Sequence, residues 1–125
     1  MATIYIYPKT GVLFGHWAMR HGLDREGLKY RSTTLRKKLE AYIAEHHIAG
    51  LGVETAGGDL TPEQLIEGDG VLVLISPYLK GEMETTVSDQ IVFLTEDEFD
   101  SKDLNRVYAM IYKLQMRGLS QKQPV

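Results

Sequence analysis

Apolar residues along the chain follow two spacings, one typical of strands and one typical of helices. Five segments have strand-like composition: residues 3–7, 12–14, 51–55, 71–75 and 90–95. Residues 71–75 are apolar without interruption, which favours a strand that is buried on both faces. The turn sequence at 8–11, with Pro8 and Gly11, predicts that the first two segments form a hairpin.

Three segments have helical signals. The apolar residues Leu35, Leu39 and Ile43 predict an amphipathic helix over about residues 33–48, with Ser32 or Thr33 as its N-cap. Leu104, Val107, Tyr108, Ile111 and Leu114 form the buried stripe of a second helix over about residues 101–117. The run Thr61-Pro-Glu-Gln64 is a capping box that opens a short helix over about residues 62–67.

These elements predict one α+β domain over residues 1–118 and a flexible tail over 119–125. The chain has 125 residues, the usual size of a single domain. We expect a mixed sheet of four or five strands with the N-terminal hairpin, packed by the two main helices and the short one. If residues 71–75 are central, a ligand crevice is expected at their carboxyl end, at Ser76, Pro77 and Tyr78.

The composition excludes several classes of protein. Apolar residues make up 43% of the chain and charged residues 25%, which argues against wholesale disorder. The chain has no cysteine, so disulfide scaffolds, zinc-thiolate sites and iron–sulfur clusters are excluded. The longest apolar run is far shorter than a membrane span, which takes about 20 residues. The start of the chain has no signal-peptide pattern, so we expect a cytoplasmic protein without membrane contact.

Charge is unevenly distributed along the chain. The net charge of −3 combines +4 in residues 1–50, −11 in residues 51–103 and +4 in residues 104–125. A basic surface is able to bind phosphate, and an acidic surface is able to bind a basic protein. Two further interpretations remain: the opposite charges neutralise each other within the monomer or across a dimer, or they are simply solvated and have no partner.

We predict a non-enzymatic, macromolecule-binding module, such as an inhibitor, adaptor or immunity-type protein, that acts on a protein partner through separate basic and acidic surfaces. The alternative is a nucleic-acid-binding protein or small nuclease that uses residues 20–38. A homodimer that pairs basic with acidic surfaces is also plausible. The candidate residues are Arg20, Arg25, Lys29, Arg31, Arg36, Lys37 and Lys38 on the basic surface, Glu96, Asp97 and Glu98 on the acidic surface, and the aromatic residues Trp17 and Tyr30.

No sequence pattern in the chain indicates a particular cofactor, metal ion or reaction. His16 and His21 are five positions apart and His46 and His47 are adjacent, whereas a helical metal motif spaces two histidines by four. The serines lack the Gly-x-Ser-x-Gly pattern of a nucleophile elbow. We therefore predict no metal and no cofactor, and we expect a binding protein rather than an enzyme.

Two short stretches are similar to known families. Thr3-Ile-Tyr5, then Leu13-Phe-Gly15 and Arg20, resemble the opening of GIY-YIG nucleases, which implies that Tyr5, on a hairpin, and Arg20, on a helix, are catalytic. Residues 60–84 resemble the central strand of TIR domains and the following loop, which implies a catalytic Glu82 or Glu84. The first stretch has Thr and Phe where the nuclease motif has Gly and Tyr, and the second leaves most of the chain unmatched, so we assign the chain to neither family.

Overall fold

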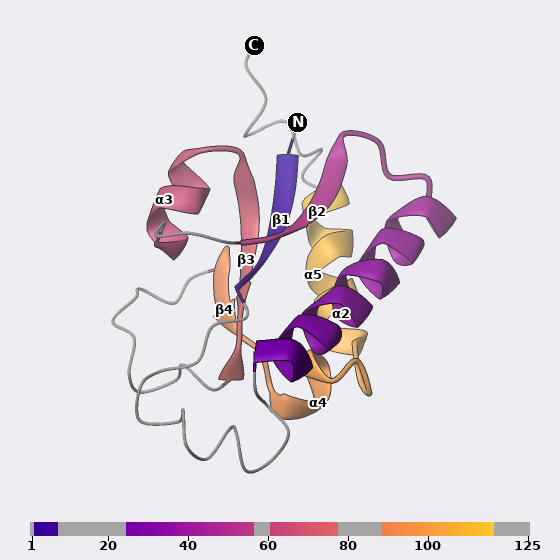
Figure 1. Cartoon of the computed structure of the whole chain (residues 1–125). Coiled ribbons are helices and arrows are strands. Elements are labelled where there is room, and N and C mark those ends of the chain that lie inside the picture. The colour runs from indigo at the N-terminus through magenta and orange to yellow at the C-terminus, as the bar shows by residue number, and fades with distance from the viewer. Residues whose placement is uncertain (1, 8–24, 57–60, 78–88, 117–125) are drawn as a thin grey trace.

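The structure is a computed structural model that describes residues 2–7, 25–56, 61–77 and 89–116, with residues 25–29 described as backbone (Figure 1). The order of its elements is β1 (Ala2–Tyr7), α2 (Arg25–Glu45), β2 (Leu51–Thr55), α3 (Pro62–Glu67), β3 (Gly70–Ile75), β4 (Ile91–Phe93), α4 (Glu96–Phe99) and α5 (Asn105–Met116). The α+β class is confirmed. The expected tail lies outside the described residues.

The four strands form one sheet in the order β2-β1-β3-β4, and every described pair is parallel. The expected mixed sheet is therefore not seen in the described residues. Parallel strands need a crossover, and α2 and α3 supply one between β1 and β2 and one between β2 and β3. Both edges of β1 are occupied, by β2 and by β3, so a hairpin strand has no place beside it. The expected hairpin strand at 12–14 lies outside the described residues.

The helix expected at 33–48 begins earlier, at Arg25, and ends at Glu45. The reason is that the two residues expected to cap it are helical. Ser32 and Thr33 lie about two turns inside α2, and Ser32 is buried. The helix expected at 101–117 corresponds to α5, which begins later, at Asn105; the separate short helix α4 precedes it, and Ser101 between the two has a φ of 63°.

The short helix α3 matches its expected bounds. The Thr61 side chain accepts from the backbone N–H of Gln64 at 3.2 Å, and the Gln64 side chain accepts from the backbone N–H of Thr61 at 2.9 Å. Pro62 occupies the first turn, where its missing N–H costs no hydrogen bond. The predicted capping box is therefore confirmed in the structure.

The sheet separates two cores. In Figure 1 it stands between α3 on one side and α2 with α5 on the other. The larger core joins α2 and α5 to alternate strand residues and includes Ile4, Ile6, Leu35, Leu39, Leu72, Leu74, Val107 and Ile111. The smaller core lies under α3 and includes Tyr7, Leu65, Val73, Ile75 and Ile91. Because β3 contributes to both cores, the expectation of a strand buried on both faces is confirmed.

Among the described residues, no helix combines the length and the apolar character needed to cross a membrane.

Candidate functional site

The basic residues of α2 contact the segment around α4. Arg31 forms an ion pair with Asp100, with 2.9 Å between Nη1 and Oδ1. The Lys38 ammonium donates to the backbone carbonyl of Ser101 at 3.1 Å. These contacts join α2 to the turn between α4 and α5, so both side chains act inside the monomer.

The remaining predicted basic residues differ in their surroundings. Arg36 pairs with Glu40 one turn along α2, at 3.0 Å. Lys37 is exposed. Arg25 and Lys29 belong to the first turns of α2, where the backbone alone is described, and Arg20 and Trp17 lie outside the described residues.

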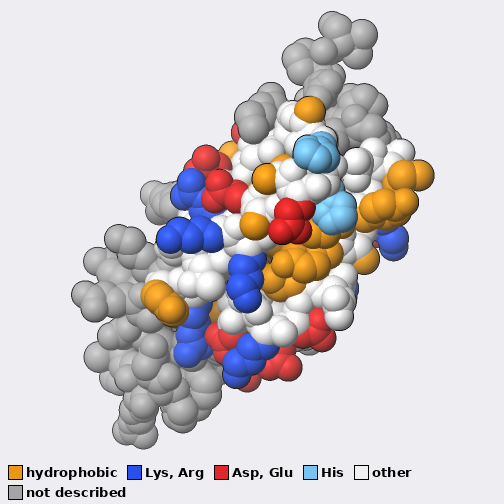
Figure 2. Space-filling view, turned by 90° about the vertical axis from the view of Figure 1, so that its right-hand side faces the viewer, with side chains coloured by type: hydrophobic (Ala, Val, Ile, Leu, Met, Phe, Trp, Pro, Cys, Tyr) orange, Lys and Arg blue, Asp and Glu red, His pale blue; other side chains and the backbone are white. Residues whose placement is uncertain are grey.

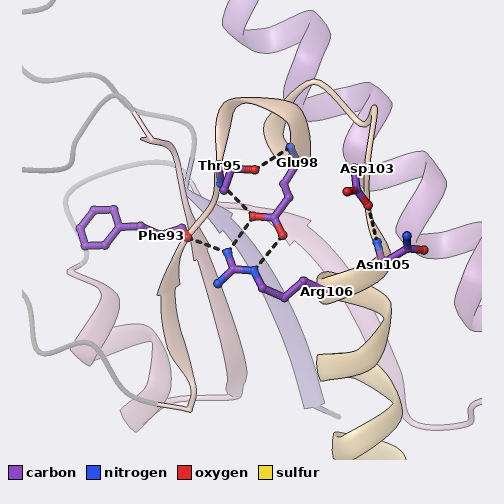
Figure 3. Close-up of polar contacts among 6 residues, drawn as sticks. All are labelled: Phe93, Thr95, Glu98, Asp103, Asn105 and Arg106. Atoms are coloured by element: carbon purple, nitrogen blue, oxygen red, sulfur yellow. Dashed lines mark hydrogen bonds and ion pairs between the residues drawn. The ribbon is translucent and has the colours of Figure 1, made fainter.

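The predicted acidic surface is also divided. Glu96 and Asp97 are exposed in α4, whereas Glu98 is buried and holds the guanidinium of Arg106 through both carboxylate oxygens, at 2.7 and 2.8 Å (Figure 3). The Glu98 carboxylate also accepts from the backbone N–H of Thr95 at 2.8 Å, and Arg106 donates to the carbonyl of Phe93 at 2.9 Å. Glu98 is thus engaged in holding β4, α4 and α5 together.

The pKa of Glu98 reflects two opposing effects. Burial alone would raise it, but the hydrogen bonds from Arg106 and from the backbone N–H of Thr95 outweigh burial and hold the pKa below its usual value. Glu98 therefore stays ionised at neutral pH, and its charge is matched by a cation of the C-terminal basic segment.

The basic and acidic segments of the sequence consequently meet in the folded chain. Arg31 with Asp100, and Glu98 with Arg106, each join residues from segments of opposite charge. Figure 2 shows cationic and anionic side chains next to one another on the face viewed there. For these two pairs, the contacts correspond to the alternative of neutralisation within the monomer.

Aromatic side chains lie at the surface between α2 and α5. The rings of Tyr42 and Tyr108 are stacked, with centroids 4.4 Å apart and planes 5° apart. His46 lies against Tyr42, with ring centroids 4.2 Å apart. Tyr112 and Met116 follow Tyr108 at successive turns of α5 and are 54% and 70% exposed. We call these five residues the α2–α5 aromatic surface, and Figure 2 shows hydrophobic side chains beside the histidines on this face.

Sequence reasoning missed most of this surface. The sequence predicts that Tyr108 lies in the buried stripe of its helix, whereas Tyr108 and its stacking partner Tyr42 are both only half-buried. The available signal was the spacing of Tyr108, Tyr112 and Met116, at i, i+4 and i+8, which places three large apolar side chains on one side of α5. The predicted aromatic residue Tyr30 is 73% exposed, but it lies twelve positions before Tyr42, about 18 Å along the helix.

A second polar cluster lies on the other face of the sheet. The Tyr5 hydroxyl donates to Asp69 at 2.6 Å, and the Thr3 hydroxyl donates to the other carboxylate oxygen at 2.7 Å. The hydrogen bond to Asp69, with burial and the nearby negative charge, raises the pKa of Tyr5 to about 12. The cluster ties β1 to the turn before β3.

This arrangement bears on the two resemblances. Tyr5 lies in a parallel sheet, not in the hairpin that the nuclease motif implies, and Arg20 lies outside the described residues. Glu82 and Glu84, which the TIR resemblance implies, are also outside them. At the expected crevice, Ser76 is buried and its backbone N–H donates to the carbonyl of Tyr7 at 2.8 Å.

Within the described part of the chain, no group of three or more histidine, aspartate or glutamate side chains is arranged to hold a metal ion. The chain matches no protein family, no curated protein and no solved structure. Its function therefore has to be inferred from the geometry of its own surface.

Proposed function

We propose that this protein is a protein-binding module whose binding site is the α2–α5 aromatic surface. The observation that carries the proposal is the row of Tyr108, Tyr112 and Met116 on α5, which continues outward from the stacked pair of Tyr42 and Tyr108. Tyrosine and methionine are enriched at protein interfaces, while an exposed run of them is unfavourable on a surface that stays in water.

The stack makes part of this surface rigid before any partner binds. Tyr108 is held against Tyr42, and both rings pack against the larger core. Because the ring is already ordered, little side-chain entropy is lost when a partner covers it. Complete burial of Tyr112 and Met116 would contribute roughly 1.5–3 kcal/mol for each large side chain.

Charge near the aromatic surface indicates the chemistry of the partner. Lys113 lies beside Tyr112 in the last turn of α5 and is exposed. The burial of the Tyr108 hydroxyl, and then the negative charge of Glu45, raise the pKa of Tyr108, so the ring stays neutral at physiological pH. A protein surface with an apolar centre and an acidic edge next to Lys113 would complement this arrangement.

The protein-binding interpretation has more support than the nucleic-acid alternative. Phosphate binding needs cations that are free to approach the backbone of the nucleic acid. Arg31, Arg36 and Lys38 already contact Asp100, Glu40 and Ser101 in this chain. The aromatic surface lacks such internal partners for Tyr112 and Met116 among the described contacts.

The test is a comparative capture experiment. The tagged wild-type protein and the variants Tyr112→Glu, Met116→Glu and Tyr30→Glu are used to isolate binding proteins from the native cell, and each candidate is then purified and titrated. We expect a partner that binds the wild type and Tyr30→Glu equally and binds the two α5 variants at least about tenfold more weakly, equivalent to 1.4 kcal/mol. Tyr30→Glu is the matched control because Tyr30 is at least as exposed as Tyr112 and Met116 but lies away from the aromatic surface.

Two outcomes would contradict the proposal. The first is a purified partner that binds all four proteins with the same affinity. The second is salt-sensitive binding of nucleic acid that Lys37→Glu weakens and Tyr112→Glu leaves unchanged, which would support the alternative function instead.

A further inference from the structure

A carboxylate lies at the margin of the α2–α5 aromatic surface. Glu45 is exposed, is the last residue of α2 and follows Tyr42 by three positions, so both side chains project from the same side of the helix. Burial first, and then the negative charge of Glu45, raise the pKa of Tyr108, so the carboxylate also lies near the Tyr108 hydroxyl. Figure 2 shows an anionic side chain beside a histidine and the hydrophobic side chains of this face. The stacked pair of Tyr42 and Tyr108 is therefore flanked by a negative charge.

This carboxylate has no cation beside it within the described part of the chain. None of the ion pairs between described residues includes Glu45, and no residue in the last turn of α2 is basic. Lys38 precedes Glu45 by seven positions, which is about 10.5 Å along the helix axis, and its ammonium donates to the carbonyl of Ser101. Among the described residues, the charge of Glu45 is thus left unbalanced.

The backbone of α2 adds to the negative charge at this position. The peptide dipoles of a helix sum to a partial negative charge at its C-terminus, equivalent to about half an elementary charge. Glu45 lies at that end of a helix of 21 residues. The carboxylate and the helix end repel each other in the free chain, and both would attract a cation brought by a partner.

We propose that the partner of the aromatic surface places an arginine side chain against Glu45 and the stacked pair of Tyr42 and Tyr108. This inference rests on the proposed function and specifies the chemistry of its partner. A guanidinium is able to donate two parallel hydrogen bonds to a carboxylate, and its flat face packs on aromatic rings. Lysine lacks both of these properties, because its ammonium is a compact and strongly hydrated charge.

A second charge of opposite sign gives the partner one orientation. Lys113 follows Tyr108 by five positions, so it projects from α5 about 140° away from Tyr108. Glu45 and Lys113 are both exposed and lie on different sides of the aromatic side chains. A partner with an arginine for Glu45, an apolar centre and an acidic group for Lys113 would match all three features in a single orientation.

The test is a titration of the full chain with N-acetyl-arginine amide, followed by the NMR signals of the tyrosine rings. N-acetyl-citrulline amide, which has a similar shape and no charge, is the matched probe. We expect saturable shifts of the Tyr42 and Tyr108 signals with the arginine probe and none with the citrulline probe. Glu45→Gln should bind the arginine probe at least about threefold more weakly than the wild type. Glu67→Gln, a change to an exposed carboxylate at the end of α3, should bind it as the wild type does.

The inference is overturned if the two probes shift the Tyr42 and Tyr108 signals equally, or if Glu45→Gln and the wild type bind the arginine probe with the same affinity. A purified partner provides a second measurement, and Glu45→Gln should bind it at least about threefold more weakly. A partner that Tyr112→Glu fails to bind and Glu45→Gln binds normally would overturn the arginine inference and leave the proposed function standing. A partner that Tyr112→Glu binds normally would contradict the proposed function itself.

Discussion

Replacing Arg106 with alanine should destabilise this protein more than any other change to an exposed charge in α5. Arg106 donates twice to the Glu98 carboxylate, at 2.7 and 2.8 Å, and once to the carbonyl of Phe93 (Figure 3). The Glu98 side chain is 6% exposed, whereas that of Arg106 is 52% exposed. The substitution therefore leaves a buried carboxylate with no cation beside it.

The exposed fractions of the Glu98 and Arg106 side chains determine how much stability the substitution removes. Removing one partner of a fully buried ion pair costs about 3–5 kcal/mol, whereas an exposed ion pair contributes about 0–1 kcal/mol. The pair of Glu98 and Arg106 lies between these limits, because water reaches the guanidinium but not the carboxylate. Glu98 also keeps its hydrogen bond from the backbone N–H of Thr95 in the variant. We therefore expect Arg106→Ala to lower the free energy of unfolding by about 2 kcal/mol at pH 7, which corresponds to a fall in melting temperature of about 8 °C.

The effect should depend on pH in a defined direction. The folded-state pKa of Glu98 lies below its usual value of 4.5, so the pair stabilises the fold fully above that value. This stabilisation is lost as the pH falls through the lowered pKa. In Arg106→Ala, burial no longer has a cation to oppose it, so the pKa of Glu98 rises. The difference in stability between wild type and variant should therefore be largest at neutral pH and should shrink below about pH 4.

Urea denaturation followed by circular dichroism, at pH 7 and at pH 3, measures both effects. The variant Arg106→Lys keeps the charge without the two-pronged geometry and should lose an intermediate amount. Lys113→Ala, a change to an exposed cation on the same helix, should stay within about 0.5 kcal/mol of the wild type. The prediction is refuted if Arg106→Ala is as stable as Lys113→Ala. It is also refuted if the loss of stability of Arg106→Ala relative to the wild type is the same at both pH values.

Three further predictions concern β1, β3 and the helix caps. Tyr5→Phe should lower the free energy of unfolding by about 1 kcal/mol, because it removes the hydrogen bond to Asp69. In absorbance titrations Tyr5 should ionise near pH 12, and Asp69→Asn should lower that pKa. The stability that this hydrogen bond provides should be lost as the pH rises from 10 to 12. Gly70→Ala should cost about 2–3 kcal/mol in urea denaturation, because the added methyl would lie 2.5 Å from a backbone oxygen of α3. Thr61→Ala and Thr95→Ala should each lower the free energy of unfolding by about 1 kcal/mol, because each removes the hydroxyl that accepts from a backbone N–H three residues on; melting temperatures equal to that of the wild type would contradict this.

The internal charge contacts also bear on the binding proposals. The sequence suggests two charged surfaces because its basic and acidic residues occur in separate segments. In the fold, Arg31 and Lys38 are committed to the segment around α4, and Glu98 is committed to Arg106. Tyr112 and Met116, by contrast, are exposed, which is why the proposed partner is a protein rather than a nucleic acid.

Several elements were predictable because their signals are local. The capping box at Thr61 and Gln64 uses groups three residues apart, and it places α3 correctly. The apolar run at 71–75 gives a strand that is buried on both faces, as β3 is. The spacing of Leu35 and Leu39 identifies the side of α2 that faces the core. Each of these features depends on side chains within a few residues, so the sequence by itself determined them.

Other features depend on residues that are far apart in the chain. Lys38 and Ser101 are 63 positions apart, and Tyr42 stacks on Tyr108 across a similar distance. These contacts exist because α2 and α5 pack on the same face of a parallel sheet whose strand order is β2-β1-β3-β4. No local pattern fixes that order, since each strand pairs across a crossover. The tertiary structure alone decided which charges cancel and which tyrosines reach the surface.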